Sequence, residues 1–366
     1  MFHKLYHFFD WPLFAAALLL SLTGIMMIYS TGLGDDPEVF LWTRQAAVLA
    51  FGVLALFFLS TLDYIFFRKA SGVLYVASLV LLALVLFFGQ EIRGAARWFN
   101  FGFFSFQPAE FSKLALVVFL ANFLKLKRPL LQKFRYVLWS GVYPGVIVGL
   151  LMLQPDLGSA IIHVAIWAGL LFLSPVPRRF LLYLLVIFLI VSAASWTLFL
   201  HDYQKDRIRS FVDPAADPQG QGYNVIQSIV AIGAGGIYGK GLARGPQSQL
   251  QFLPERQTDF IFASLVEELG FVGGGLVLIL FFLIFIRLIK IAREAREMFG
   301  TFLVIGFFFL MLTQTLVNIG MNLGLVPVTG VTLPFLSYGG SSLLVTFLML
   351  GMVESAARRS LKVRFG

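Results

Sequence analysis

The chain has 366 residues, of which 59% are hydrophobic, 13% are charged and 41 are Phe. Ordinary soluble domains contain about 25% charged residues, so this composition excludes an ordinary soluble protein. It indicates a protein whose solvent is a lipid bilayer. The sequence has no Cys, which excludes disulfides, thiol nucleophiles and cysteine-ligated metals, and its net charge of +9 must be interpreted by location.

Apolar stretches long enough to cross about 30 Å of hydrocarbon as helices recur along the whole chain. The first, from Trp11 to Tyr29, has a weakly basic flank and no small-residue cleavage site after it, so we interpret it as a membrane span. The predicted spans are about 11–30, 43–61, 71–89, 108–126, 137–153, 158–173, 180–199, 260–287, 301–320 and 335–354. The predicted fold class is an all-α integral membrane protein with about ten transmembrane helices, a single polytopic membrane domain over residues 1–366.

The basic residues distinguish the two ends of these spans. With an even number of spans, both termini lie on one side, together with the short loops that carry most of the Lys and Arg residues. The positive-inside rule assigns that side to the cytoplasm, which predicts a multi-pass protein of the bacterial cytoplasmic membrane in contact with membrane lipid. The net charge therefore reflects orientation and does not indicate nucleic acid as a partner. The remaining basic residues concentrate in two outer segments, roughly 90–113 and 200–258.

The second of these segments, the outer loop at about 200–258, lies between the seventh and eighth spans. An ordered loop of this length is unusual unless it has a function. Within it, Tyr223 to Ile232 has the pattern of a short amphipathic helix, and the Gly-rich run Gly233 to Gly241 follows. Such a run can present backbone N–H groups to phosphate oxygens, with Lys240 adding charge, or it can be a flexible connector.

Charged side chains at the rim of a membrane helix are costly and mark a pair, a pathway or a site. Glu110 and Lys113 follow Pro108 at the start of the fourth span, and their i, i+3 spacing lets them meet on one helix face. They are candidates for substrate binding. The alternative is a structural pair in which each charge neutralises the other.

Four further acidic residues are candidates. Asp156 lies between the fifth and sixth spans, where capping of a helix is the favoured role. Asp259 stands at the start of the eighth span, where the helix N-terminus also stabilises a carboxylate. Glu267 and Glu268 lie two to three turns further along and have structural and functional interpretations of equal weight. The single intramembrane His163 has no neighbouring metal-ligand pattern, so we expect a buried, hydrogen-bonded histidine.

An outer-face carboxylate beside two basic segments suits the transfer of a sugar from a lipid diphosphate. The diphosphate leaves as a stable anion that Lys and Arg can hold, so it needs no general acid. One carboxylate then suffices to accept the proton of the acceptor hydroxyl, whereas glycosidases need a pair. Asp259 is the candidate catalytic residue, as a base, an acceptor-orienting group or a metal ligand.

Several long motifs of the chain carry a family resemblance. They are NIGMNLGLVPVTGVTLPFLSYGGSS (Asn318 to Ser342), HDYQ (His201 to Gln204), DPAADPQGQGYNVIQS (Asp213 to Ser228), GKG (Gly239 to Gly241) and QSQLQFLPERQTDFIF (Gln247 to Phe262). On these motifs the chain resembles the SEDS family (shape, elongation, division and sporulation) over nearly its whole length. It resembles the elongation members more closely than the division members. For the SYGGSS segment itself we favour a role in helix packing over direct chemistry.

The resemblance implies ten transmembrane helices, a large outer loop between the seventh and eighth, and an activity. SEDS proteins are peptidoglycan glycosyltransferases that polymerise lipid II into glycan strands and release undecaprenyl diphosphate, with a class B penicillin-binding protein as crosslinking partner. The family's essential Asp falls on Asp259, and its characteristic Glu and Lys fall on Glu110 and Lys113. One departure is Ala109, which stands where the family commonly has Ser and leaves Glu110 in place.

The hypothesis is therefore an inverting glycosyltransferase whose diphosphates are held by basic residues. The candidates are Lys113, Arg207, Arg209, Lys240 and Arg244. A divalent cation such as Mg²⁺ or Mn²⁺ could share that work. The alternatives are a lipid II flippase, which would also expose an outer lipid-diphosphate site, and a non-catalytic scaffold of the elongation machinery. Transporters often have inverted repeats, and no such symmetry is visible in the sequence.

Overall fold

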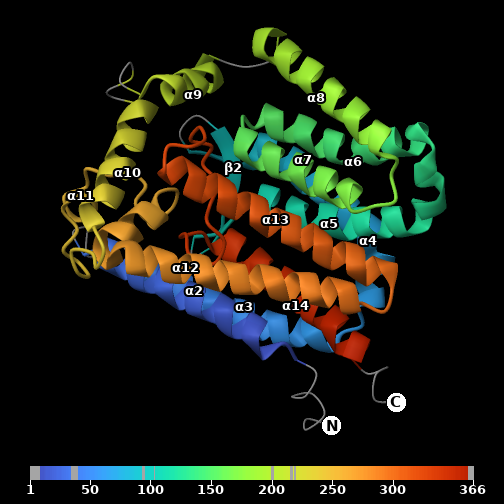
Figure 1. Ribbon diagram of the computed structural model, residues 1–366, viewed down its shortest axis with the longest axis horizontal. Helices are drawn as coiled ribbons and strands as arrows, with labels where there is room; N and C mark the ends of the chain where they lie inside the picture. The colour runs from blue at the N-terminus through green and yellow to red at the C-terminus, as the bar shows by residue number, and fades with distance from the viewer. Residues whose placement is uncertain are drawn as a thin grey trace.

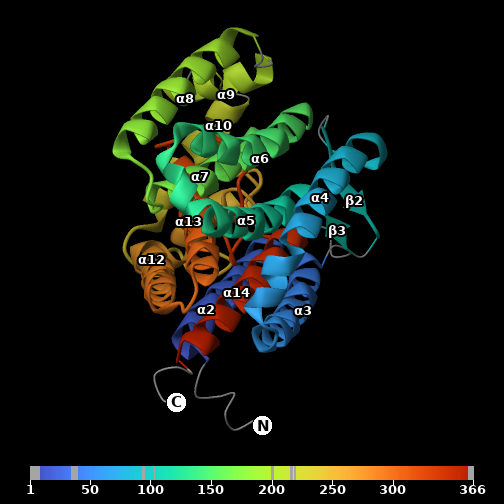
Figure 2. The same cartoon turned by 90° about the vertical axis from the view of Figure 1, so that its right-hand side faces the viewer.

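The computed structural model of the chain describes residues 9–361 except 34–39, 93, 94, 103, 199–201, 215, 216, 218 and 219. The described chain is a bundle of long helices with a small three-stranded sheet (Figures 1 and 2). The helices are α2 (Trp11–Thr31), α3 (Leu41–Thr61), α4 (Tyr64–Phe88), α5 (Pro108–Lys127), the 3-10 helix η1 (Arg128–Gln132), α6 (Phe134–Leu153), α7 (Leu157–Phe172), α8 (Arg178–Leu198), α9 (Asp202–Val212), α10 (Gln221–Gly235), α11 (Pro246–Gln249), α12 (Ile261–Glu294), α13 (Met298–Asn322) and α14 (Gly340–Leu361), and the strands are β1 (Gln90–Ile92), β2 (Ala95–Asn100) and β3 (Ser105–Phe106).

Long helices occupy every position that was predicted as a span. Within the described residues, α2 to α8 and α12 to α14 match the ten predicted stretches. Seven of them are long and apolar enough to cross a membrane, and the shorter α7 is apolar as well. The prediction of an all-α integral membrane protein with about ten transmembrane helices is confirmed.

Local capping explains where the helices begin. Asp10 accepts a hydrogen bond from the backbone N–H of Leu13 at 3.1 Å and caps α2. Asp63 caps α4 in the same way through Ile65 at 2.9 Å, so α4 begins at Tyr64 and not at the predicted position 71. The apolar pattern did not include residues 64–70, because a capped helix can continue past the edge of the hydrocarbon.

Two other boundaries differ from the predicted ones: the start of α14 and the end of α12. Phe335 has a positive φ of 66°, which a helix does not tolerate, and α14 begins only at Gly340. Helix α12 continues to Glu294, past the predicted end at 287, because no helix breaker interrupts its basic end. It is bent at Gly270, whose φ of 70° and ψ of −169° lie outside the helical region.

Helix α5 lies at the centre of the bundle. Figure 2 shows it among α4, α7, α13 and α14, and α5 packs against all four. The consecutive residues Leu114 to Val118 are all buried, so α5 has no lipid-facing side over that turn. Small residues allow the close approach: a Cβ on Gly306 of α13 would lie 2.7 Å from Val117.

The two polar segments lie toward the ends of helices that the charge pattern assigns to the outer side. Helices α9, α10 and α11 belong to the segment predicted as the outer loop, and α10 confirms the predicted amphipathic helix. The sheet, in which β2 pairs antiparallel with both β1 and β3, belongs to the first basic segment. It was not predicted, because its three strands have 3, 6 and 2 residues and too little alternation to detect.

Both described ends of the chain meet at the opposite end of the bundle. Arg287 of α12 forms a bidentate ion pair with Asp10, and its Nη2 lies 2.5 Å from Oδ2. The backbone N–H of Asp10 donates to Glu354 of α14 at 3.0 Å, and the guanidinium of Arg358 lies 5.1 Å from the ring centre of Phe9. The first and last described residues therefore lie on the same side, which is consistent with an even number of crossings.

We expect Asp10→Ala to destabilise the bundle strongly. The substitution removes the cap of α2 and leaves the Arg287 guanidinium, whose side chain is 24% exposed, without its carboxylate. Breaking a buried ion pair costs about 3–5 kcal/mol, so the thermal unfolding midpoint in detergent should fall by many degrees.

Asp63→Ala is the matched control. Asp63 also caps a helix and also meets an arginine, Arg359 at 3.3 Å, but its side chain is 47% exposed. The expected loss is about 1 kcal/mol, the sum of a cap and a weak surface pair. Equal shifts for the two variants would contradict a special contribution of the buried pair.

Candidate functional site

Asp259 lies in the turn directly before α12, and the backbone of this turn is fixed at three consecutive carbonyl groups. The Nδ2 atoms of Asn318 and Asn322 both donate to the carbonyl of Asp259, each at 3.0 Å. The carbonyl of Thr258 accepts from the hydroxyl of Ser337 at 2.6 Å. The carbonyl of Gln257 accepts from the backbone N–H of Tyr338 at 2.8 Å.

The two asparagines are themselves held in place. Asn318 also donates to the carbonyl of Val331 at 2.7 Å, and Asn322 accepts from the N–H of Ala263 at 3.0 Å. Both asparagines are fully buried one turn apart on α13. Buried amides in a membrane helix are costly, and these two are used to join the start of α12 to the segment after α13.

The side chain of Asp259 is half-buried beside the turn 329–331. A Cβ built on Gly330 would lie 3.7 Å from Oδ2 of Asp259, and it would meet no other described atom within 4 Å. Gly330 has a φ of +74°, which favours glycine at this position. The carboxylate therefore has space next to it on the Gly330 side.

Two other elements converge on the same turn. Nη1 of Arg207, on α9, lies 3.5 Å from the carbonyl oxygen of Thr329. At the start of α7, a Cβ on Gly158 would lie 2.6 Å from that same oxygen. The turn 329–331 thus brings together Asp259, a cation of the outer segment and the QPDLG motif that contains Asp156.

Asp156 is the N-cap of α7. It accepts from the N–H of Ser159 at 3.0 Å and from its hydroxyl at 2.8 Å. The turn before it is held by Arg97 of β2, which donates to the carbonyls of Gln154 at 2.8 Å and Pro155 at 2.6 Å. Both oxygens of the Asp156 carboxylate are used by the cap, as the favoured sequence interpretation expected.

Glu110 and Lys113 form an ion pair of 2.6 Å at the start of α5. Their side chains are only 8% and 3% exposed. The N–H of Gln107, just before α5, donates to Ser341 of α14 at 3.0 Å, so the pair lies next to the SYGGSS segment. In this arrangement the Lys113 ammonium is bound to Glu110 and is not presented at the surface.

His163 is buried and hydrogen-bonded, as the sequence predicted. Its Nε2 lies 2.9 Å from the hydroxyl of Ser112, and its Nδ1 lies 2.7 Å from the carbonyl of Ser159. The histidine therefore links α5 to α7 beside the Asp156 cap. Among the described residues no group of three or more His, Cys, Asp and Glu side chains could hold a metal ion.

Glu267 and Glu268 are both fully buried, and their carboxylates join α12 to α11 and α2. Glu267 accepts from the N–H of Gln247 at 2.7 Å and from the N–H and hydroxyl of Ser248 at 3.0 and 2.7 Å. Glu268 accepts from the hydroxyl of Ser30 on α2 at 2.5 Å. The two glutamates are acceptors for protein groups, which supports their structural interpretation.

Of the two interpretations of the Gly-rich run, the phosphate cradle does not hold for its last three N–H groups. Those of Gly239, Lys240 and Gly241 donate to the carbonyls of Gly235, Glu267 and Glu268, at 2.8, 3.0 and 3.0 Å. Gly239 packs so closely on the carbonyl of Glu268 that no side chain would fit. The N–H groups of Lys240 and Gly241 thus dock this segment on α12, and that of Gly239 bonds back to the end of α10, so none of the three is left for a ligand.

The basic candidates differ in what already surrounds them. Lys240 and Arg244 are exposed and form no ion pair with any residue that the structure describes. Arg209 is exposed and pairs with Asp206 at 3.1 Å. Arg207 is half-buried against the turn 329–331, and Lys113 is buried with Glu110.

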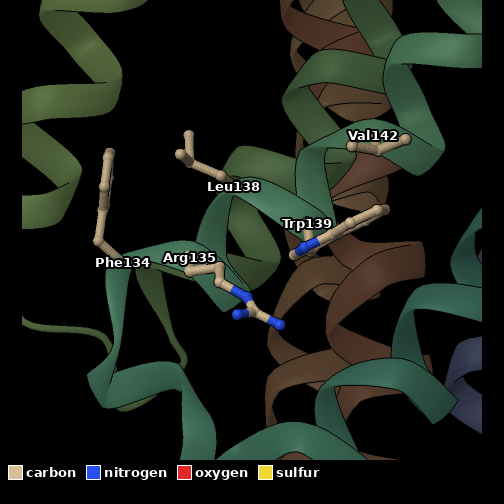
Figure 3. Close-up of a pocket in the computed structure, with 5 residues that line it drawn as sticks. All are labelled: Phe134, Arg135, Leu138, Trp139 and Val142. Carbon is tan, nitrogen blue, oxygen red and sulfur yellow. The ribbon is translucent and has the colours of Figure 1, made fainter.

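The sequence did not single out Asn318, Asn322 and Ser337 as parts of the site. Their signal was present, because two Asn residues at i and i+4 inside an apolar helix need partners. A shallow cavity of about 320 Å³ on α6, in contrast, lies along Phe134 to Val142 and does not belong to this site (Figure 3). Its residues lie in the first half of α6, at the opposite end of this helix from the turn at Gln154.

Comparison with known proteins identifies the family. The model of the FtsW/RodA/SpoVE family, described as cell cycle proteins, matches residues 10–362. The chain is 39% identical to stage V sporulation protein E of Bacillus subtilis, over 96% of this chain and 97% of that protein. It is 36% identical to the peptidoglycan glycosyltransferase MrdB of Escherichia coli K12, over 92% and 90% of the two chains.

Two solved structures have the same fold. A chain from a peptidoglycan synthase complex, studied for the coordination of polymerization and crosslinking, superposes with a TM-score of 0.81 at 38% identity, covering 96% of this chain and 98% of that one. Rod shape determining protein RodA of Thermus thermophilus gives a TM-score of 0.71 at 32% identity, covering 96% and 97%. The predicted resemblance, including that to elongation members, is confirmed. This multi-pass membrane protein belongs to the SEDS family, the FtsW/RodA/SpoVE family of cell cycle proteins.

Proposed function

We propose that the chain is a peptidoglycan glycosyltransferase of cell elongation. It polymerises lipid II into glycan strands at the outer face of the cytoplasmic membrane and releases undecaprenyl diphosphate. The observation that carries the proposal is the half-buried carboxylate of Asp259, whose backbone is fixed and which lies beside the turn 329–331 that Arg207 also contacts. The name of MrdB and the family membership support the reaction class.

In the proposed reaction, Asp259 accepts the proton of the acceptor hydroxyl. The hydroxyl oxygen forms a bond to the anomeric carbon of the donor sugar as the bond from that carbon to the diphosphate oxygen breaks. Attack from the face opposite the diphosphate inverts the configuration. The electron pair of the broken bond leaves on the diphosphate, which cations stabilise, so one carboxylate is enough.

We assign the diphosphate contacts first to Arg207, Lys240 and Arg244. Arg207 lies beside the turn 329–331, which Asp259 also faces. Lys240 and Arg244 are exposed without a carboxylate partner among the described residues. Arg209 comes after them, because Asp206 already neutralises part of its charge. Glu110 and Lys113 act as a pair that positions the start of α5, because a buried ion pair is costly to open.

A divalent cation, Mg²⁺ or Mn²⁺, enters the proposal only as a companion of the diphosphate. Resident metal sites are built from several carboxylate, carbonyl or imidazole ligands, and the described residues bring no three His, Cys, Asp or Glu side chains together. The residues therefore do not fit a resident metal. No step of the reaction above is routed through one.

The proposed location is the bacterial cytoplasmic membrane with both termini in the cytoplasm. The described ends of the chain lie at one end of the bundle, near the basic loops, which supports this orientation. The proposed partner is a class B penicillin-binding protein that crosslinks the strands. Its support is the similarity to a chain of a synthase complex that coordinates polymerization and crosslinking.

We expect Asp259→Asn to reduce polymerisation by at least about 100-fold, because an amide cannot accept the acceptor's proton. The fold should be retained, since the four groups around this turn bind backbone carbonyls and not the carboxylate. The measurement is glycan polymer formed from labelled lipid II by purified protein with its transpeptidase partner.

The matched control is Asp206→Asn, an identical change at an exposed carboxylate of α9. It should keep activity within a few-fold. Polymer made by Asp259→Asn at the wild-type rate would refute the catalytic assignment. Translocation of lipid II across liposomes without polymer from the wild type would favour a flippase instead.

Asn322→Ala tests whether the buried amides position Asp259. It removes one donor to the Asp259 carbonyl and the acceptor for Ala263, and small displacements of a reacting group cost about 10- to 100-fold in rate. We expect kcat to fall with little change in KM for lipid II. Gln314→Ala is the control, because Gln314 is a buried amide on the same helix whose Nε2 has no partner among the described residues. A comparable fall in kcat for both variants would mean general damage to α13.

The double variant Lys240→Gln and Arg244→Gln should raise KM for lipid II several-fold. Both side chains are exposed cations in the outer segment, so the difference from wild type should shrink at high salt. Arg209→Gln, which removes an arginine that is already paired with Asp206, should change KM less. An equal or larger effect of Arg209→Gln would reverse the ranking of the cations.

A further inference from the structure

Helix α6 carries a lengthwise groove near its first residue. Phe134, Arg135, Leu138, Trp139 and Val142 line an open cavity of about 320 Å³ (Figure 3). The last four of these residues follow Phe134 by one, four, five and eight positions, which places all five along one side of the helix. The groove therefore runs parallel to the axis of α6 and, in a membrane, along the direction of the lipid chains.

The dimensions of this α6 groove match one leaflet of a bilayer. Eight helical residues extend about 12 Å, and half of the hydrocarbon thickness is about 15 Å. A transmembrane helix of a partner would need a contact about twice as long. Since α6 begins directly after the basic loop, the groove lies in the leaflet next to the side that we assign to the cytoplasm.

Arg135 lines the groove, and the loop ends before α6 and α8 carry further basic residues. The sequence has no Asp or Glu between Glu110 and Asp156, nor between Asp156 and Asp202. Gln132 donates to the carbonyl of Pro175 at 2.7 Å, which joins the loop before α6 to the loop before α8. The basic side chains of these two loop ends are Lys133, Arg135, Arg178 and Arg179, and none of them forms an ion pair with a residue that the structure describes.

The walls of the groove suit a hydrocarbon chain with a polar head. Leu138 and Val142 are exposed apolar side chains, and Trp139 is 53% exposed. The Trp139 indole N–H makes no hydrogen bond within the described residues, and tryptophan at this depth commonly meets lipid head groups. Phe134 closes the α8 side by packing on Phe180, with ring centres 5.2 Å apart.

The geometry points to a binding site for an anionic phospholipid of the cytoplasmic leaflet. The phosphate binds Arg135, with Lys133, Arg178 and Arg179 contributing charge, and one acyl chain lies along Leu138, Trp139 and Val142. An arginine at the membrane surface attracts anionic head groups and holds a phosphate by paired hydrogen bonds. The site is independent of Asp259 and of the polymerase reaction and rests only on the proposed orientation.

The lipid also supplies a neighbour for α8. Beyond its first turns, α8 is exposed along the stretch Leu182 to Val191, and it stands apart from the bundle in Figures 1 and 2. The groove opens beside the start of α8, where Tyr183 meets Phe134 at 5.7 Å between ring centres. A bound acyl chain at this place fills space that protein side chains leave open.

Native mass spectrometry of the purified full-length protein tests the site. The probes are phosphatidylglycerol and phosphatidylcholine with the same acyl chains, added to the delipidated protein in detergent. We expect the wild type to retain phosphatidylglycerol several-fold more than phosphatidylcholine. Arg135→Ala should remove most of that preference, while Lys69→Ala, which deletes an exposed charge of α4 on the same side, should keep it.

A second variant tests the chain pocket without changing charge. Val142→Trp fills the groove at a lipid-facing position, so it should lower retention of both phospholipids while the thermal unfolding midpoint stays close to wild type. Equal retention of the two lipids by the wild type would overturn the proposal. So would an equal loss from Lys69→Ala and Arg135→Ala, or full phosphatidylglycerol retention by Val142→Trp.

Discussion

The chain between α13 and α14 runs through the bundle outside any helix, so most of its backbone groups need partners from elsewhere. Inside a membrane protein such backbone is stable only where protein groups replace water. Gln45 of α3 does this on both sides, donating to the carbonyl of Ser337 at 3.1 Å and accepting from the N–H of Gly339 at 3.2 Å. The hydroxyl of Ser337 accepts from the N–H of Leu333 at 2.8 Å and donates to the carbonyl of Thr258. One hydrogen-bond network therefore satisfies the backbone of this segment and fixes the turn before Asp259.

The acidic residues in the outer half of the protein differ in the groups that their carboxylate oxygens bind. Glu267 and Asp156 each use both oxygens on neighbouring N–H and hydroxyl groups, which offsets the cost of burying a carboxylate. Asp259 instead is fixed through its backbone, and its carboxylate is half-buried next to space at Gly330. The bonds from Asn318 and Asn322 go to the backbone carbonyl of Asp259, so they do not depend on what its carboxylate binds.

The sequence predicted the parts of the structure that depend on hydrophobicity and charge. The ten long helices follow from apolar length alone, whereas the early start of α4 depended on the cap at Asp63. The sequence left the Gly-rich run Gly233 to Gly241 open between a phosphate cradle and a connector, because glycines permit close approach of any backbone; at Lys240 and Gly241 that backbone is α12. The network around Asp259 could not be derived, because Asn318 and Asp259 are distant in sequence and their contact depends on tertiary packing.

The pair Glu110–Lys113 limits how the outer cations can share a substrate. At 2.6 Å and with almost no exposure, Lys113 already neutralises Glu110 in a buried place, and opening that pair is strongly unfavourable. The pair instead keeps the start of α5 neutral next to Gln107 and Ser341, where a single uncompensated charge would disturb the SYGGSS segment. In the proposed reaction, the contacts with the diphosphate therefore fall to cations such as Lys240 and Arg244, which are exposed in the segment before α12. Burial therefore separates two kinds of cation: Lys113 belongs to the packing at the start of α5, whereas Lys240 and Arg244 lie at the surface.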